Sequence, residues 1–260
     1  MNRRLLVYGL VVPMAFFLVA PTIIVVIISF SSSSILFFPP PGYGLRWYDQ
    51  FFHVSTWTDA AATSLKVATG SMLAATTLGT VTALGLVRGR YPARGLVNGL
   101  MLSPLIVPTV IVALGMYILY LRAHLVGTLL ALMVAHSTLS LPYVVINVAA
   151  ALRTMDPTME LAAQSLGAPP LRTFLMVTLP LILPSVVAGA LFAFITSWDE
   201  VVVSLFLSTP FLQTLPVVIW TPVRSDVDPT VAAASSLVTG VSLLVLLGLF
   251  SARRRANVPG

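Results

Sequence analysis

The sequence holds 260 residues, of which 58% are hydrophobic and only 8% are charged, with a mean hydropathy of +0.99. A soluble domain of this length has too little interior to bury so much apolar surface, which excludes a soluble globular protein. The formal net charge of +6 does not indicate nucleic-acid binding, because most arginines lie in short clusters between apolar runs, without interleaved aromatics. The sequence contains no cysteine, which excludes disulfide bonds and thiolate metal sites.

The apolar runs predict six transmembrane helices, each close to the roughly 20 residues that a bilayer requires. The first run is too long for the apolar core of a signal peptide and shows no clear cleavage site, so we expect an uncleaved span. The prediction is an all-α integral membrane protein with a single domain over residues 1–260. Its spans are expected at about residues 5–29, 64–87, 97–121, 126–149, 177–205 and 230–250.

Positively charged residues predict the orientation of these spans. Ten of them lie on one side of the predicted helices and four lie on the other. Since cytoplasmic loops carry the excess of lysine and arginine, both termini and the loop at about residues 150–176 are expected in the cytoplasm. The ten are Arg3, Arg4, Arg88, Arg90, Arg94, Arg153, Arg172, Arg253, Arg254 and Arg255, and the four are Arg46, Lys66, Arg122 and Arg224.

The first outer loop, residues 31–63, is rich in proline, aromatic and turn residues. Aromatic rings favour the headgroup region of a bilayer. The loop therefore predicts an amphipathic segment at the outer membrane interface, with Trp47, Tyr48, Phe51 and Phe52 as its anchors.

One polar segment after the fourth predicted span interrupts the apolar pattern. Asp156 followed by Pro157 predicts a helix start, with a side-chain acceptor at the N-cap and a fixed φ at the first helical position. Gly167 is placed to end this helix in a left-handed conformation, and Pro169 and Pro170 prevent its continuation. Taken alone, the pattern also fits an amphipathic loop on the bilayer surface. The apolar face with helical spacing consists of Met159, Ala162, Ala163 and Leu166.

The same segment resembles the EAA loop of bacterial ABC importer permeases. The resemblance rests on fixed spacing: Ala162 and Ala163, three residues, Gly167, nine residues, then Val177, one residue, Leu179 and Pro180. Further positions that fit are Leu166, Ala168, Phe174, Pro184 and Gly189. The resemblance implies a type I importer permease fold of the MetI-like kind, and a coupling helix that sits in a groove of the cytoplasmic ATPase subunit. The coupling residues that it implies are Asp156, Glu160, Ala162, Ala163, Leu166, Gly167 and Ala168.

One position departs from the family pattern. The acidic residue usually lies directly before the two alanines, and this chain has Leu161 there, with Glu160 one residue earlier. The hypothesis that Glu160 makes an ionic contact with the ATPase in place of that acid is left open by the sequence.

Several outer segments resemble the spermidine/putrescine-type branch of these permeases. They are residues 31–63, 197–202, 213–216 and 228–230. The resemblance implies that the solute is a small organic cation. In a separate stretch, Ser103–Leu105, Leu105 stands where some polyamine permeases carry an acid. Opines and other small organic cations are therefore alternatives.

Asp199 and Glu200 are adjacent acids near the outer end of the fifth predicted span. Because a carboxylate that faces lipid is costly, both are expected to face the bundle interior. Successive helical residues point about 100° apart, so we expect Asp199 toward the cavity and Glu200 toward a neighbouring helix or subunit. One hypothesis is a cation-binding pair with Trp198 adding a cation–π contact. The other is a solvated helix end or an ion pair with Arg224. The candidate residues of the substrate pathway are Trp198, Asp199, Glu200 and Trp220.

The sequence carries no nucleotide site of its own. Lys66 is the only lysine, and no glycine-rich loop with Lys-Ser or Lys-Thr precedes a helix. It has no HExxH motif, and His53, His124 and His136 lie far apart in the chain, so we expect neither a metal site nor catalytic residues. His136 falls within the fourth predicted span, where a hydrogen-bonded structural role and a proton relay are both open. No cofactor is expected on this chain, and ATP and Mg are expected on partner ATPase chains.

The resemblance implies one permease subunit of an ATP-driven importer in the bacterial inner membrane. It implies import of a polyamine-like or opine-like solute by alternating access. The implied partners are a homologous permease subunit, two ATP-binding subunits and a periplasmic substrate-binding protein. The alternative is a self-sufficient ion-coupled secondary transporter. Such transporters commonly contain inverted repeats, and we find none in the sequence.

Overall fold

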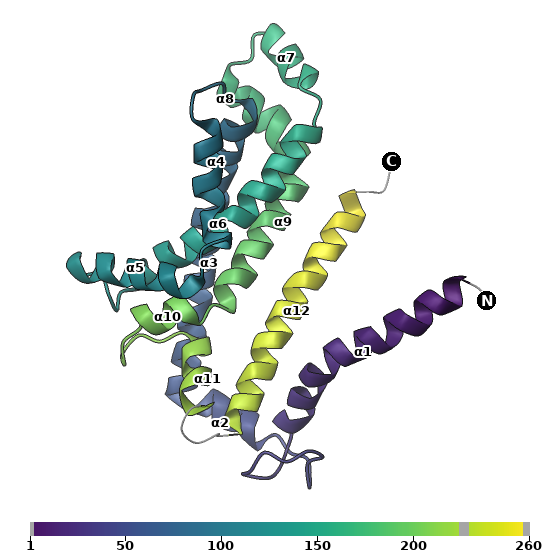
Figure 1. Cartoon of the computed structure of the whole chain (residues 1–260), viewed down its shortest axis with the longest axis vertical. Helices are drawn as coiled ribbons and strands as arrows, with labels where there is room; N and C mark the ends of the chain where they lie inside the picture. Colours follow the sequence, from purple (N-terminus) through teal and green to yellow (C-terminus); the bar gives the residue numbers. More distant parts are fainter. Residues whose placement is uncertain (1–2, 224–228, 257–260) are drawn as a thin grey trace. The chain divides into compact units, whose positions relative to one another are not determined.

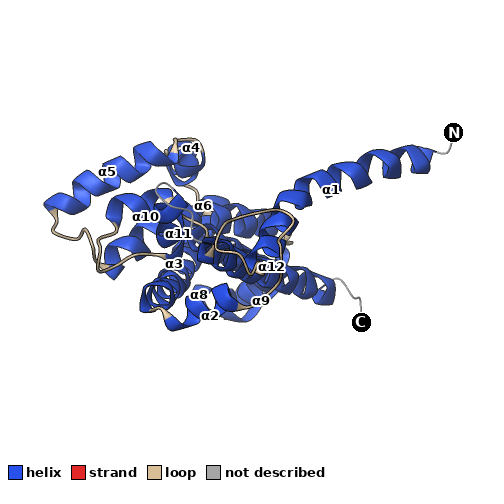
Figure 2. Cartoon of the chain, turned by 90° about the horizontal axis from the view of Figure 1, so that it is seen from below, coloured by secondary structure: helices blue, strands red, loops and turns tan. Residues whose placement is uncertain are grey.

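A computed structural model describes residues 3–223 and 229–256 of the protein. Regular structure in these residues is helical, apart from two isolated β-bridges, as the colouring of Figure 2 shows. The all-α class predicted from the sequence is therefore confirmed. The elements are α1 (Arg3–Ser29), α2 (Arg46–His53), α3 (Ser55–Arg88), α4 (Arg94–Leu102), η1 (Ser103–Leu105), α5 (Thr109–Arg122), α6 (Leu129–Thr154), α7 (Thr158–Ser165), α8 (Pro170–Thr173), η2 (Phe174–Thr178), α9 (Leu179–Trp198), α10 (Val202–Leu207), α11 (Leu215–Val223) and α12 (Thr230–Ala256).

The chain forms two compact units. The first contains Met1–Ala61 and Leu215–Val241, and the second contains Ala62–Thr214 and Ser242–Gly260. Helices α3 and α12 run from one unit into the other. The single domain expected over the whole chain stays a prediction.

The first unit is built on aromatic and aliphatic side chains of α2, α11 and the first turns of α3 and α12. Trp47 and Phe51 of α2 are buried there, and the indole Nε1 of Trp47 donates a hydrogen bond of 2.7 Å to the carbonyl oxygen of Ser31. The prediction that these two rings anchor the chain at the membrane interface is wrong, because both pack inside the protein. The core residues of this unit are Phe51, Trp57, Ala60, Leu215, Val218, Val231 and Ala234.

In the second unit, α3, α6 and α9 meet in a core with very close helix contacts. Helices α6 and α9 pack along each other (Figure 1). A Cβ atom added at Gly79 of α3 would lie 2.8 Å from Cβ of Val144 on α6, and one added at Gly189 of α9 would lie 3.0 Å from Cα of Val144. Small residues allow such close approach between membrane helices. We call this group the α3–α6–α9 core, and its buried members are Ala75, Ala83, Val144, Val148, Ala149, Leu152, Ile182, Val186 and Ala193.

The third predicted span, residues 97–121, is not one straight helix. Helices α4 and α5 occupy it, with a bend of 102° between them. Pro104 and Pro108 lie at the break, and each lacks a backbone N–H and disfavours helix at the residue before it. Helix α5 then packs against α10 and α6 in a second core of the same unit.

Five helical segments in the described residues are long and apolar enough to cross a membrane, or six if the bent pair counts as one span. The fifth predicted span, residues 177–205, is displaced in the structure, because the helical segment begins at Pro170 and ends at Trp198. The chain then breaks before the short helix α10. The five segments are Tyr8–Ser29, Ser55–Arg88, Leu129–Thr154, Pro170–Trp198 and Thr230–Gly248.

Candidate functional site

The first candidate site is the loop of α7 and α8, which lies at one end of α6 and α9 in Figure 1. Asp156 lies at the start of this loop, where its Oδ1 accepts a hydrogen bond of 2.9 Å from the backbone N–H of Thr158. Hydrogen bonds from Thr158 hold the pKa of Asp156 below its ordinary value, so this exposed carboxylate is ionised at neutral pH. The helix start predicted at Asp156 and Pro157 is therefore present, with α7 beginning at Thr158.

The end of α7 at Gly167 is fixed by a Schellman motif. Gly167 has a φ of +89°, and its N–H donates to the carbonyl of Gln164 at 2.9 Å. The N–H of Ala168 donates to the carbonyl of Ala163 at 3.1 Å. These two bonds satisfy carbonyl groups that a helix end leaves without partners. A Cβ at Gly167 would meet nothing within 4 Å, so only the left-handed backbone restricts this position.

The loop exposes several large apolar side chains to its surroundings. Leu161 is 59% exposed and Leu166 is 90% exposed, and none of the residues of α7 is buried. A loop that carries several such side chains away from the cores of its own chain is typical of a protein-binding or membrane-binding surface. We call these exposed side chains together the loop face, and its members are Met159, Leu161, Leu166 and Leu171.

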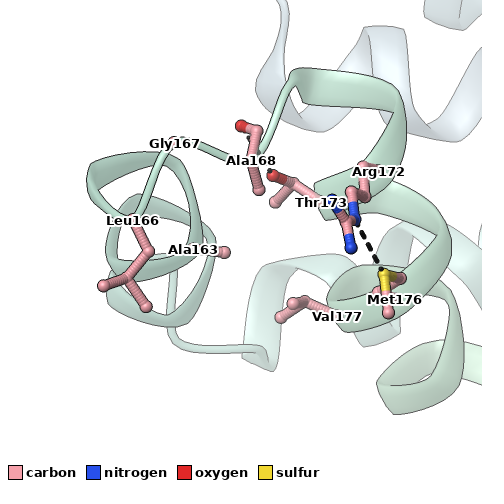
Figure 3. A pocket seen from close by; sticks show the side chains of 8 residues that line it. All are labelled: Ala163, Leu166, Gly167, Ala168, Arg172, Thr173, Met176 and Val177. Carbon is pink, nitrogen blue, oxygen red and sulfur yellow. Dashed lines mark hydrogen bonds between the residues drawn. The ribbon is translucent and has the colours of Figure 1, made fainter.

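A pocket of about 320 Å³ lies between α7 and the following helical turns (Figure 3). Ala163 from α7 and Val177 from η2 lie on opposite sides of it. Arg172 lines the pocket, and its Nε lies 3.3 Å from Sδ of Met176. The hydroxyl of Thr173 donates to the carbonyl of Ala168 at 3.5 Å, a long contact that joins the loop to α8. The pocket thus has a mixed lining, in which apolar side chains lie beside the hydroxyl of Thr173 and the guanidinium of Arg172.

Glu160 points into the protein rather than toward the loop face. Its side chain is only 15% exposed, its Oε1 accepts a hydrogen bond of 2.8 Å from the hydroxyl of Thr178, and its Oε2 lies 2.9 Å from Nε of Arg88. The N–H at Nε is not aligned for a hydrogen bond, so the contact with Arg88 is an ion pair. Leu161, at the position where the family pattern has its acid, is exposed instead. An ionic contact of Glu160 with an ATPase stays a prediction, and the carboxylate already has two partners in its own chain.

The second candidate site is the break between α9 and α10. The carboxylate of Glu200 accepts backbone N–H groups of Val202 and Val203 at 3.1 and 2.9 Å, and that of Ser204 at 3.4 Å. An acid in this position caps the start of the next helix. The expectation that Asp199 and Glu200 follow one another along a continuous helix is therefore wrong, because α9 has ended at Trp198.

His136 joins the two sides of this break. It is 1% exposed, with Nδ1 2.8 Å from the hydroxyl of Ser197 and Nε2 3.0 Å from the hydroxyl of Ser204. Both ring nitrogens are therefore occupied by hydroxyl partners on α9 and α10. This geometry favours the structural role over the proton relay, since a relay needs a path beyond the two serines.

The other predicted pathway residues lie in different surroundings. Asp199 is exposed, with Ser242 as a distant hydroxyl partner at 3.3 and 3.5 Å. Trp198 is 6% exposed and stacks on Phe194 with ring centroids 5.9 Å apart, so its ring face is not open to a solute in this conformation. Trp220 is exposed and belongs to the first unit. Arg224, the alternative ion-pair partner, lies outside the described residues.

Metal ligands do not cluster in residues 3–223 and 229–256, where no group of three histidine or acidic side chains is placed to hold an ion.

The family is established by sequence comparison. A family model described as "Binding-protein-dependent transport system inner membrane component" matches residues 75–256, which include α7, α8, α9 and α10. The chain belongs to this family. It is a multi-pass permease of the inner membrane, and the resemblance noted in its EAA-like loop is confirmed.

Several relatives of the permease are about a third identical to it over most of its length. It is 36% identical over 206 residues to the putrescine transport system permease protein PotI of Escherichia coli (strain K12), covering 76% of this chain and 73% of that one. It is 33% identical over 214 residues to the spermidine/putrescine transport system permease protein PotC of Haemophilus influenzae, covering 82% and 83%. It is also 34% identical over 201 residues to the molybdenum transport system permease protein ModB of Mycobacterium bovis, covering 72% and 76%.

Solved structures agree on the fold of the permease. A bacterial alginate ABC transporter, in complex with an alginate pentasaccharide-bound periplasmic protein, matches with a TM-score of 0.76 at 17% identity over 100% of this chain and 97% of that one. At this identity the match shows the fold alone. It confirms the importer-permease fold implied by the coupling-loop resemblance.

Two residues of the permease site were missed in the sequence. Arg88 enters the sequence prediction only through its charge, and Thr178 carries no sequence signal of its own. The sequence signal for Arg88 is that its charge is opposite to that of Glu160. Several other arginines carry the same charge, so this signal does not show which of them pairs with Glu160. Thr178 lies on a π-helical turn, where the N–H of Leu179 bonds to the carbonyl of Phe174 five residues earlier. That turn sets the direction of the Thr178 side chain, and only Pro180, which lacks an N–H, hints at it.

Proposed function

We propose that the permease is a transmembrane subunit of an ATP-driven importer and that its α7–α8 loop docks on a cytoplasmic ATPase subunit. The observation that carries this proposal is the loop face, held in one conformation by the Schellman motif at Gly167. Exposed leucines on a rigid turn suit a protein groove, because rigid segments lose little entropy on binding. ATP hydrolysis takes place on the partner, since this chain has no phosphate-binding loop with a lysine.

The assembly that we propose contains this permease, a homologous permease, two ATPase subunits and a periplasmic binding protein. Membership in a family of binding-protein-dependent transport components supports the last partner. ATP and Mg bind to the ATPase chains, and this chain works without a cofactor. Alternating access moves the solute: closure of the ATPases displaces the loop, and the helices attached to it open the pathway on the other side.

The solute that we propose is a small organic cation of the polyamine or opine type. The relatives PotI and PotC are named for putrescine and for spermidine/putrescine. ModB, named for molybdenum, is as similar to this chain, so similarity of this degree does not fix the solute. The argument from the chain itself is the exposed carboxylate of Asp199 at the end of α9, which attracts cations and repels anions.

Co-purification tests the proposal most directly. The tagged permease, expressed with the genes of a complete importer, is expected to retain an ATPase subunit in detergent, and uptake in vesicles is expected to require ATP. Uptake by the permease alone, driven by an ion gradient without ATP, would instead establish the self-sufficient secondary transporter. For the solute, competition of labelled putrescine uptake by spermidine and by an opine distinguishes the two classes of cation.

A further inference from the structure

The coupling helix α7 has little apolar attachment to the rest of its chain. None of its eight residues is buried, and the neighbouring elements that it contacts most are η2 and α8. Its large apolar side chains belong to the exposed loop face. A helix without a buried face depends on its ends and on polar contacts for its position. The side chain of Glu160 makes such polar contacts.

Glu160 reaches two helices at once. Its Oε2 pairs with Arg88, the last residue of α3, and its Oε1 accepts a hydrogen bond from Thr178, the last residue before α9. Thr178 is 2% exposed, so this hydrogen bond is shielded from water. We call Glu160, Arg88 and Thr178 the Glu160 clamp.

Both attachment points of the clamp border the α3–α6–α9 core. On α3, Ala83 belongs to this core and Val87, the residue before Arg88, packs against it. On α9, Ile182 belongs to it and Leu179, the residue after Thr178, packs against it. In this core α3, α6 and α9 touch with almost no free space at Val144. A displacement at Arg88 and Thr178 is therefore passed on to packed helices, because close-packed interiors transmit strain.

Some N–H donors of Arg88 form no hydrogen bond in this arrangement. Its Nε faces Glu160 without an aligned N–H, and its Nη2 is shielded from solvent and has no hydrogen-bond partner among the described residues. A guanidinium carries five N–H donors in one plane. When α7 shifts, Glu160 can exchange one nitrogen of Arg88 for another, so the ion pair survives the movement.

We propose that Arg88 and Thr178 are positioning residues of the coupling helix, which hold Glu160 and so transmit the movement of α7 to α3 and α9. This inference rests on the proposed docking of α7 on an ATPase. It assigns the acid of this loop a role inside the permease, in place of a contact across the interface.

The test compares transport with ATP hydrolysis in the complete importer, reconstituted in liposomes. Glu160→Gln and Arg88→Gln are expected to retain the ATPase subunits and basal ATP hydrolysis, while solute moved per ATP falls at least about fivefold, the lower end of ordinary coupling between sites. The exchanged pair, Arg88→Glu with Glu160→Arg, is expected to recover most of the loss. Arg153→Gln is the matched control, since Arg153 is an exposed arginine at the end of α6, outside the clamp, and it should leave the ratio unchanged.

If the charge variants fail to assemble, a second pair of variants at Thr178, which leaves both charges in place, still tests the clamp. Thr178→Val removes the hydroxyl at nearly constant shape and is expected to lower solute moved per ATP, whereas Thr178→Ser keeps the donor and should not. An unchanged ratio in Glu160→Gln or in Thr178→Val overturns the clamp. Loss of the ATPase subunit from Glu160→Gln also overturns it, because the carboxylate then contacts the ATPase. Failure of the unaltered chain to retain an ATPase is a different result, which refutes the proposed function itself.

Discussion

Two glutamates of the second unit have partners of different kinds for their carboxylates. Glu200, between α9 and α10, is bound by backbone N–H groups of the residues that directly follow it. Glu160, on α7, is bound by side chains of Arg88 and Thr178, which belong to other segments of the chain. Local partners fix the local course of the chain. Distant partners tie one element to another.

The comparison shows that an acid in an apolar membrane chain is not by itself evidence for a ligand. Both glutamates were candidates for external contacts in the sequence, one with an ATPase and one with a cationic solute. In the structure both carboxylates are turned to their own chain, because an unpaired carboxylate in apolar surroundings is costly. We therefore expect changes at the α9–α10 break to lower stability, and changes at the α7 loop to lower transport.

The largest effect on stability is expected at His136, which joins the two sides of the α9–α10 break. His136→Leu leaves the hydroxyls of Ser197 and Ser204 without their partner and should lower the unfolding free energy by about 2–6 kcal/mol, about 1–3 for each of the two buried hydroxyls. His136→Gln keeps two hydrogen-bonding atoms and should be milder. Thermal unfolding of the purified permease in detergent measures both. Equal stability of the Leu variant and the unaltered chain would contradict a structural role for the break.

Glu200→Ala should have the next largest effect. It removes the acceptor at the start of α10, which is expected to cost about 2 kcal/mol, as for loss of a strong N-cap. Glu200→Gln keeps one acceptor oxygen, so its unfolding free energy should lie between those of Glu200→Ala and the unaltered chain. We expect Glu200→Ala to lower the unfolding temperature, while solute moved per ATP stays constant in the molecules that assemble. A loss of coupling without a loss of stability would place Glu200 in the same class as Glu160.

The sequence predicts the α7 loop better than the break. Asp156 with Pro157, Gly167, and the two prolines after it are local signals, and each acts on the few residues beside it. They require no knowledge of the fold, so the start and the end of α7 lie within one residue of the prediction.

The break after Trp198 was missed because hydropathy does not detect it. Apolar residues continue to Leu207, and the run has the length of a span. The available signal was Glu200 itself, an acid placed just before a short apolar helix. The partners of Glu160 and His136 depend on which helices pack together, and spacing along one chain does not give that. Pro104 and Pro108 likewise mark a weak point, but their sequence does not give the 102° bend.

Gly167→Val tests the loop without disturbing a core. Nothing lies within 4 Å of the added Cβ position, so the cost is the left-handed backbone alone, about 1–2 kcal/mol, confined to the turn. The permease should still insert and keep its unfolding temperature within a few degrees, while uptake falls because the loop face is displaced. Gly167→Asn is the matched control, since asparagine tolerates this conformation better. Normal uptake by the Val variant would show that docking does not depend on the turn.

The smallest effect is expected at Asp199, the exposed acid at the α9–α10 break. Its hydroxyl partner Ser242 is 3.3 Å away or more, and the side chain is exposed, so water screens any pairing with a cationic solute. An exposed ion pair contributes up to about 1 kcal/mol. Asp199→Asn should therefore reduce the uptake of labelled putrescine by about fivefold or less, the factor that corresponds to this free energy. The loss should shrink as salt is raised, because screening acts on exposed charges first. Unfolding temperature and basal ATP hydrolysis should not change. Ser242→Ala is the matched control, since it removes the partner and keeps the charge. Equal uptake by Asp199→Asn and the unaltered permease at low salt would show that Asp199 has no role in binding the solute.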